Sequence, residues 1–243
     1  MLCYFRPMII WYSRPTILIR SVLRNTFLKS ILSKLVYGNQ YEEKYSKALL
    51  EQIRSSDVVW DIGANIGLYS VQFAKRLGTD GAVKAFEPVP EVFIKLKENT
   101  ELHPQVTCSN IALSEANGPT FIERGQDPLL ATSRIINDKS DSSIQVQAMT
   151  GDEFLRIGNG SFPTFLKIDV EGHELSVLKG MKELLEKNPP RVIGVEIHFE
   201  KLTEVGEKYG PMEIVHMLQR NYKLKWTDPS HVVCILREKL HEK

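Results

Sequence analysis

Short apolar runs alternate with stretches of helical periodicity along most of the chain. Five runs rich in β-branched residues are typical of buried strands, namely Asp57–Ile62, Val83–Phe86, Val106–Leu113, Thr164–Val170 and Arg191–Ile197. Apolar residues at helical spacing predict helices over Tyr41–Arg54, Leu68–Leu77, Pro90–Leu102, 173–187 and Pro211–Arg220. This alternation predicts an α/β fold with a doubly wound, mostly parallel sheet and helices on both faces.

Two parts of the pattern depart from strict alternation. Residues 114–150 contain glycines and prolines among short β-like runs, which indicates an insertion that forms a hairpin or a lid. A short helix is expected over Asp152–Ile157. Near the end of the chain, Tyr222–Trp226 and His231–Arg237 are typical of an antiparallel hairpin.

The charge is distributed unevenly. The 243 residues carry a net charge of +1, with 42% hydrophobic and 25% charged residues, which is ordinary for a globular protein. The first 41 residues, however, hold no Asp or Glu and carry +6, which leaves −5 for the remainder. We therefore expect a basic, hydrophobic N-terminal extension over 1–40 and one mildly acidic domain over 41–243.

The extension has no uninterrupted run long enough to span a membrane, because Ser13-Arg14-Pro15 and Arg20 divide its apolar segments. We interpret it as a helical segment that packs on the domain or on a partner, with peripheral contact to a membrane surface as the alternative. The near-neutral total charge gives no reason to expect a nucleic-acid partner. Three scattered cysteines favour a reducing compartment such as the cytoplasm.

In a doubly wound sheet, ligands bind beyond the carboxyl ends of the strands. The first predicted strand ends in Asp61-Ile-Gly-Ala-Asn-Ile-Gly67, where glycines let the backbone approach a ligand closely. The spacing differs from the Gly-x-Gly-x-x-Gly of dinucleotide sites. A carboxylate at Asp61 would repel a pyrophosphate and favour a cationic ligand.

The second strand ends at Glu87, in Ala-Phe-Glu-Pro. An acid at this position can accept hydrogen bonds from both hydroxyl groups of a ribose. Together with the glycine turn, Glu87 predicts a nucleoside-binding site.

Acidic residues and histidines follow the fourth and fifth strands. Asp169 ends a buried strand in Lys167-Ile-Asp-Val-Glu-Gly-His-Glu174, so its carboxylate should face the crevice. Glu196 and His198 alternate at the end of the next strand. These side chains suit proton transfer, and Asp169, Glu196 and His198 also offer hard ligands for Mg²⁺; the spacing does not demand a metal, and we expect none.

These motifs, together with Asn110-Ile-Ala-Leu113, resemble the FkbM-type methyltransferases, which have the class I fold that uses S-adenosylmethionine. The resemblance covers roughly 57–198, and the terminal hairpin also fits that fold. It implies a Rossmann-like, seven-stranded sheet. The string Lys-Ile-Asp-x-Glu-Gly-x-Glu is its most specific part, whereas the glycine loop indicates only the superfamily.

The resemblance also implies roles for individual residues. Gly63, Asn65 and Gly67 would line the methionine end of S-adenosylmethionine, with Asp61 near its ammonium group. Glu87 would hold the ribose. The adenine would be bordered by Asn110 and Ala112. Asp169 would face the reacting sulfonium and the acceptor, and the candidates for a catalytic base are, in order, Asp169, His198 and His173.

The implied activity is O-methylation of a hydroxyl on a sugar, lipid or secondary metabolite, so that the partner is a small-molecule, glycan or lipid acceptor. Two alternatives remain open. An NAD-dependent oxidoreductase is disfavoured by the glycine spacing and by Asp61, and an inactive methyltransferase-fold interaction protein is disfavoured by the intact acidic residues.

Overall fold

The computed structural model describes residues 38–123, 134–136, 143–158 and 161–238. The chain divides into two units, Met1–Ser46 and Lys47–Lys243. Helix α4 (Gly38–Leu50) crosses the boundary between them, and it starts and ends a few residues before the predicted Tyr41–Arg54. The extension over 1–40 lies outside the described residues, apart from the first three residues of α4.

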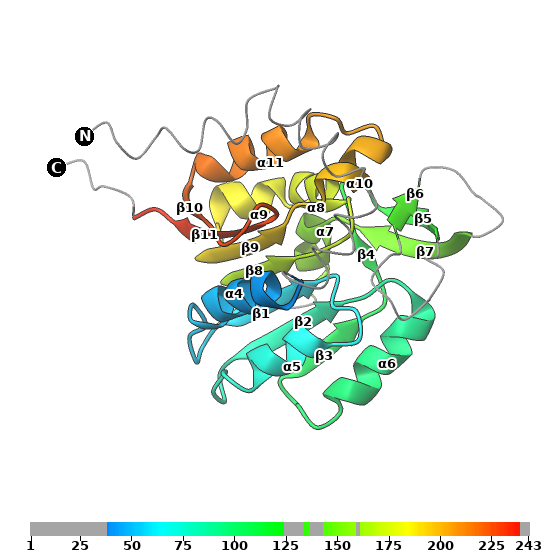
Figure 1. The fold of residues 1–243 in the computed structure, drawn as a ribbon. Coiled ribbons are helices and arrows are strands. Elements are labelled where there is room, and N and C mark those ends of the chain that lie inside the picture. The colour runs from blue at the N-terminus through cyan, green and yellow to red at the C-terminus, as the bar shows by residue number, and fades with distance from the viewer. Residues whose placement is uncertain (1–37, 124–133, 137–142, 159–160, 239–243) are drawn as a thin grey trace, which may run out of the picture. The chain divides into compact units, whose positions relative to one another are not determined.

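A seven-stranded sheet forms the centre of the second unit (Figure 1), in the order β10-β11-β9-β8-β1-β2-β3. The strands are β1 (Val58–Ile62), β2 (Ala82–Phe86), β3 (Val106–Ser109), β8 (Phe165–Ile168), β9 (Val192–Glu196), β10 (Tyr222–Trp226) and β11 (His231–Leu236). Strand β11 is antiparallel to both of its neighbours, and all other pairs are parallel. The predicted fold class is therefore confirmed.

Successive side chains on each strand point to opposite faces, and each face is covered by helices. Trp60 and Ile62 join the larger apolar core, to which α7 (Gly151–Arg156), α8 (Glu174–Lys179), α9 (Lys182–Lys187), α10 (Phe199–Glu204) and α11 (Gly210–Gln219) contribute. On the other face, α5 (Leu68–Ala74) packs on β1–β3 and α6 (Pro90–Thr100) on β3, as Figure 1 shows. The central strands β1, β8 and β9 are thus buried on both sides, which is why they are largely apolar. The edge strands β3 and β10 are partly exposed.

The segment after β3 leaves the main sheet. A single strand over Val106–Leu113 was predicted, and this prediction is wrong. Strand β4 (Ala112–Leu113) pairs with β7 (Ser143–Met149) in a second sheet of order β4-β7-β5-β6. Strand β5 (Gly118–Glu123) pairs antiparallel with β7, and β6 (Arg134–Ile136) pairs with β5. Much of the predicted insertion over 114–150 is therefore β-structure, and its connections lie outside the described residues.

The predicted helix over 173–187 is also wrong as one element, because it is broken between α8 and α9 by contacts from elsewhere. The carboxylate of Asp152 accepts hydrogen bonds from the amides of Glu183 and Leu184, both at 2.9 Å, and so caps the start of α9. A Cβ at Gly180 would lie 1.9 Å from the carbonyl oxygen of Ser114. The break therefore depends on neighbours that the local periodicity does not show.

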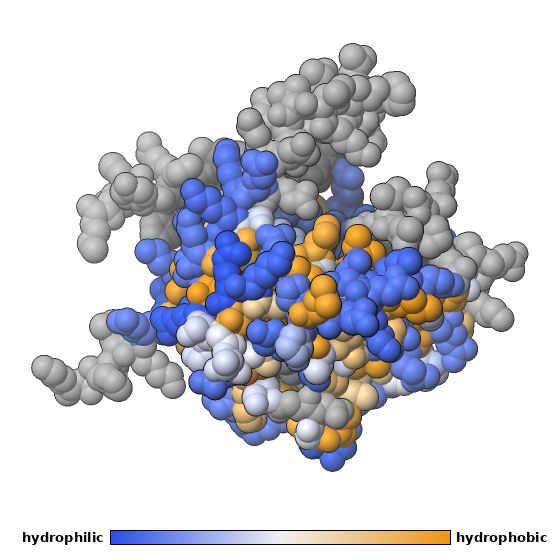
Figure 2. All heavy atoms as spheres, turned by 90° about the horizontal axis from the view of Figure 1, so that it is seen from below, coloured by the Kyte–Doolittle hydropathy of each residue, from blue (hydrophilic) through white to orange (hydrophobic). Residues whose placement is uncertain are grey.

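Figure 2 shows one face of the molecule, coloured by hydropathy. Apolar side chains lie there in separate groups between polar ones. Within the described part of the chain, no helix has the length and apolar character that crossing a membrane requires.

Candidate functional site

A cleft lies at the carboxyl ends of β1, β2 and β8, where the topology predicts a ligand. It is open to solvent, and its volume counted together with the solvent space at its mouth is about 750 Å³. Polar side chains and glycine enter it from three loops, whereas its remaining wall is apolar. The polar and glycine lining consists of Gly63, Asn65, Glu87, Asp169, Glu171 and His173, and the apolar lining includes Ile62, Phe86, Pro88, Ile111, Ala112 and Leu113.

The glycine turn after β1 is fixed by backbone contacts. Gly63 has a φ of +76° and Asn65 a φ of +50°, both in the left-handed region. The amide of Ala64 donates to the carbonyl of Phe86 at 2.9 Å. A Cβ at Gly63 would lie 1.9 Å from the carbonyl oxygen of Asp169, so only glycine lets the β1 and β8 turns approach this closely.

We expect Gly63→Ala to destabilise the fold far more than Gly158→Ala. Both glycines have nearly the same φ, +76° and +79°, but nothing lies within 4 Å of a Cβ at Gly158. For Gly158→Ala, the control, the free energy of unfolding should fall by about 1–2 kcal/mol because of the left-handed backbone alone. For Gly63→Ala it should fall by about 1–3 kcal/mol more, which is the usual cost of overpacking a crowded core. Denaturant unfolding measures both, and equal losses would contradict the close approach at Gly63.

Glu87 is the buried acid at the end of β2, with 7% of its surface exposed. Its Oε2 accepts from the amide of Asn65 at 3.0 Å and its Oε1 from the amide of Val89 at 2.9 Å. Burial disfavours the charged form more than these hydrogen bonds favour it, and raises the pKa of Glu87 to about 7. Each oxygen retains a lone pair that a ligand hydroxyl can use.

This raised pKa has a consequence for stability. Folding favours protonated Glu87, so its contribution to stability is largest below pH 4.5, falls as the pH rises toward 7, and is then constant. The neutral variant Glu87→Gln lacks this loss. We therefore expect the midpoint temperature of Glu87→Gln, relative to the unmodified protein, to rise between pH 5 and pH 8 in calorimetry, whereas parallel curves would contradict the raised pKa.

The remaining residues expected at the cofactor lie around the cleft rather than all within it. Ala112 lines the cleft beside Ile111. Asn110 donates from Nδ2 to the carbonyls of Glu87 and Pro88, at 2.8 and 3.0 Å, and so joins the ends of β2 and β3. At Gly67, a Cβ would lie 2.8 Å from Leu96 on α6, so this glycine allows the two helices to pack closely.

Asp61 belongs to a buried ionic group behind the cleft. It is fully buried, and its Oδ2 accepts from the hydroxyl of Ser70 at 2.6 Å. Lys167 Nζ lies 3.3 Å from both Asp61 and Asp169 and donates to the carbonyl of Gly63 at 3.1 Å. Burial lowers the pKa of Lys167, but the two carboxylates outweigh it, so the pKa stays above its usual range. One lysine is thus shared between two acids and ties both turns together.

Asp169 is the member of this ionic group that is exposed at the surface of the cleft. It lines the cleft, and its side chain is 28% exposed. Burial alone would raise its pKa, but Lys167 and His198 hold the pKa below the usual range. Asp169 is therefore ionised at neutral pH.

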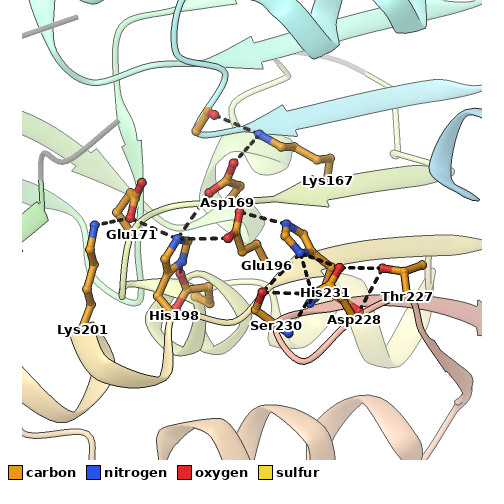
Figure 3. Close-up of polar contacts among 12 residues, drawn as sticks. Lys167, Asp169, Glu171, Glu196, His198, Lys201, Thr227, Asp228, Ser230 and His231 are labelled. Atoms are coloured by element: carbon orange, nitrogen blue, oxygen red, sulfur yellow. Dashed lines mark hydrogen bonds and ion pairs between the residues drawn. The ribbon is translucent and has the colours of Figure 1, made fainter. Parts of the chain in front are cut away.

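His198 lies among four acidic side chains (Figure 3). Its Nδ1 lies 2.7 Å from Oε1 of Glu174, and its Nε2 lies 3.0 Å from Oε2 of Glu171. Asp169 and Glu196 are further from Nε2, at 3.9 and 3.6 Å. Burial disfavours the imidazolium, but the hydrogen bonds to Glu171 and Glu174 raise the pKa of His198 to about 11.

His231 joins the same group, and the sequence reasoning missed it. Its Nε2 lies 3.2 Å from Oε2 of Glu196, and its Nδ1 lies 2.9 Å from Asp228, whose side chain is 2% exposed. In the antiparallel pair, His231 is in register with Glu196. The start of β11 therefore lies at the same edge as the ends of the parallel strands. His231 could have been found from the sequence if the predicted terminal hairpin had been paired with the fifth predicted strand.

His173 lines the cleft apart from that group. Its Nε2 lies 2.9 Å from the hydroxyl of Ser114. Burial lowers the pKa of His173 to about 4, so it is neutral at pH 7. Of the three candidates for a base, the structure therefore places Asp169 and His173 on the cleft and His198 behind Asp169.

The chain matches a known protein family over most of its length. The profile of the methyltransferase FkbM domain matches residues 61–224. This segment includes the glycine turn, Glu87, Asp169 and His198.

One curated relative is the hexuronic acid methyltransferase AglP of Haloferax volcanii. It is 35% identical over 158 residues, which cover 65% of this chain and 62% of that protein. The match thus spans less than two thirds of the relative.

Two solved structures share the fold. The methyltransferase FkbM from Methylobacillus flagellatus has 17% identity and a TM-score of 0.50, with coverage of 76% of this chain and 45% of that one. A methyltransferase-like protein from Streptococcus mutans, solved in complex with S-adenosylhomocysteine, has 13% identity and a TM-score of 0.51, with coverage of 82% and 98%. The resemblance expected from the motifs is confirmed, and this chain belongs to the FkbM methyltransferase family.

Proposed function

We propose that this protein transfers a methyl group from S-adenosylmethionine to a hydroxyl group of a sugar. The observation that carries the proposal is the place of Glu87, a buried carboxylate at the end of β2 that faces the cleft. An acid at this position receives the ribose hydroxyls of nucleosides bound to doubly wound sheets.

The charge of the cleft favours S-adenosylmethionine over a dinucleotide. Its described lining contains three acids, Glu87, Asp169 and Glu171, and neither lysine nor arginine. A pyrophosphate would have no cation to neutralise it there, whereas a sulfonium and an ammonium group would meet carboxylates. This charge pattern also argues against the NAD-dependent alternative.

Different parts of the cleft would bind different parts of S-adenosylmethionine. Gly63 and Asn65 offer a narrow turn for the methionine part, and Glu87 accepts from the ribose. Pro88, Ile111 and Ala112 provide an apolar wall for the adenine. Asp61 is buried behind the turn, and we propose that it acts on the ammonium group only through the shape and charge of that turn.

When bound, S-adenosylmethionine supplies the methyl group, so that a C–S bond breaks while a C–O bond forms on the acceptor. Asp169 is placed at the cleft surface to take the proton of the acceptor hydroxyl. Lys167 keeps Asp169 ionised and fixes its position. Positioning of the hydroxyl in line with the methyl group supplies much of the expected acceleration.

The acceptor class is proposed from the relative of Haloferax volcanii, whose name gives a hexuronic acid as its substrate. The test is incubation of the full chain with methyl-labelled S-adenosylmethionine and either a glucuronic acid glycoside or the matched glucoside. We expect label in an alkali-stable methyl ether of a sugar. If the label were alkali-labile, the product would be a methyl ester and the acceptor would be the carboxylate instead of a hydroxyl. If neither methyl transfer nor cofactor binding in calorimetry were detected, the proposal would be overturned.

A further inference from the structure

We infer that the ends of β8 and β9 form a site for one divalent metal ion, with Asp169, Glu196 and His198 as its ligands. This inference goes beyond the proposed function, since binding of the ion requires neither the cofactor nor the acceptor. It also departs from the expectation, drawn from the spacing in the sequence, that these three residues bind no metal.

The geometry of the three side chains suits a common ion. His198 Nε2 lies 3.9 Å from Asp169 Oδ1 and 3.6 Å from Glu196 Oε1. One ligand atom from each residue lies within 4.8 Å of the other two. Ligand atoms about 2.0–2.5 Å from one ion are at most about 4–5 Å apart, so these atoms need only small adjustments.

His198 is oriented as a metal-binding histidine usually is. Its Nδ1 is held by Glu174, which is fully buried, and this contact turns Nε2 toward Asp169 and Glu196. Histidines that bind metals typically have their other nitrogen held by a carboxylate in this way. Binding of the ion would displace the proton that Nε2 directs at Glu171.

Glu196 is oriented by a second pair of the same kind. Asp228 holds Nδ1 of His231, and Nε2 of His231 lies 3.2 Å from Oε2 of Glu196. Oxygen Oε1 of Glu196 is left facing His198. Figure 3 shows the two histidines directed at Glu196 from opposite sides. Glu196 therefore lies between two imidazoles, each of which is oriented by a carboxylate at its other nitrogen.

The local charge calls for a cation. The group contains five carboxylates, namely Asp169, Glu171, Glu174, Glu196 and Asp228. The cations in contact with it are Lys167, which Asp61 also shares, Lys201, which pairs with Glu171, and the protonated imidazoles of His198 and His231, so the carboxylates still outnumber the cations. Oxygen Oε2 of Glu174 is buried and accepts no hydrogen bond from the described residues. Buried negative charge of this kind is stabilised by a bound cation.

The donor set indicates the class of metal. One imidazole and two carboxylates suit Mn²⁺ or Zn²⁺ better than Ca²⁺, which prefers oxygen ligands only. Asp169 and Glu171 also line the cleft, so the ion would lie beside the place proposed for the acceptor hydroxyl. There it would lower the pKa of that hydroxyl and so assist its loss of a proton.

The first test is a titration of the chelator-treated full chain with Mn²⁺ alone. The electron spin resonance signal measures the concentration of free Mn²⁺ and therefore how much is bound. We expect one site per chain. Glu196→Gln and Asp169→Asn should each weaken the affinity at least tenfold, and Glu174→Gln about tenfold or more by releasing His198. Glu101→Gln, which removes an exposed acid after α6, is the matched control and should bind as the unmodified protein does.

A second test needs no variant. Mn²⁺ broadens the magnetic resonance signals of nearby nuclei, so the imidazole signals of His198 and His231 should broaden at low Mn²⁺ while those of His103 and His216 stay sharp. The proposed metal site would be overturned by any of three results. These are a lack of saturable Mn²⁺ binding, an unchanged affinity in both Glu196→Gln and Asp169→Asn, and broadening of the signals of His103 or His216 alone. Calorimetric binding of S-adenosylmethionine, measured separately, tells failure of the metal site from failure of the proposed function.

Discussion

Replacement of Asp169 by Asn is expected to lower the turnover number of methyl transfer by about 10²–10⁴-fold, the usual contribution of a positioned base. The amide cannot take the proton of the acceptor hydroxyl, although it fills the same space beside Lys167. Cofactor affinity, measured by calorimetry, should stay measurable, because the ribose contact at Glu87 is untouched. Single-turnover assays with the labelled cofactor measure the loss.

The matched control is Asp80→Asn, which removes an exposed carboxylate in the loop before β2 and should leave turnover unchanged. Glu196→Gln separates two roles of Asp169, because it removes a metal ligand and leaves the base in place. If Asp169→Asn kept full activity, Asp169 would be neither the base nor essential to the reaction.

Replacement of Glu87 by Ala is expected to weaken binding of S-adenosylmethionine at least tenfold, or about 1.4 kcal/mol. The variant loses the acceptor for the ribose hydroxyls. It also frees the amides of Asn65 and Val89, which Glu87 holds at 3.0 and 2.9 Å. The affinity is measured by calorimetry with the unreactive product S-adenosylhomocysteine.

Glu101→Ala is the control for this substitution, since its side chain is exposed beyond the end of α6. Thermal unfolding of both variants checks that the fold is retained. An unchanged affinity in Glu87→Ala would refute the ribose role and would leave the cleft without a reason to prefer a nucleoside.

The sequence allowed prediction of the main sheet because its central parallel strands, β1, β8 and β9, are buried on both faces. Apart from Lys167, a strand such as β8 is then an apolar run, which stands out against the amphipathic helices around it. The same reasoning located the turns at Gly63, Glu87 and Asp169, because parallel strands bring their carboxyl ends to one edge. The cleft at that edge is lined by all three residues.

What could not be predicted depends on contacts between distant segments. Strand β4 follows β3 after two residues, and only its pairing with β7 shows that it has left the sheet. The break between α8 and α9 depends on Asp152, which lies 31 and 32 residues before the two amides that it caps. The place of His231 beside Glu196 follows from the register of β11 against β9, which the strand pattern alone does not determine.

The antiparallel strand β11 has a practical consequence for anyone who shortens this chain. The matched family segment ends at residue 224, yet β11 lies between β9 and β10 in the sheet. An expression product trimmed to that segment would lose Asp228 and His231 and leave an apolar edge at β9 open to aggregation. A lack of activity in that product would then reflect a damaged sheet edge and would not test the proposed methyl transfer.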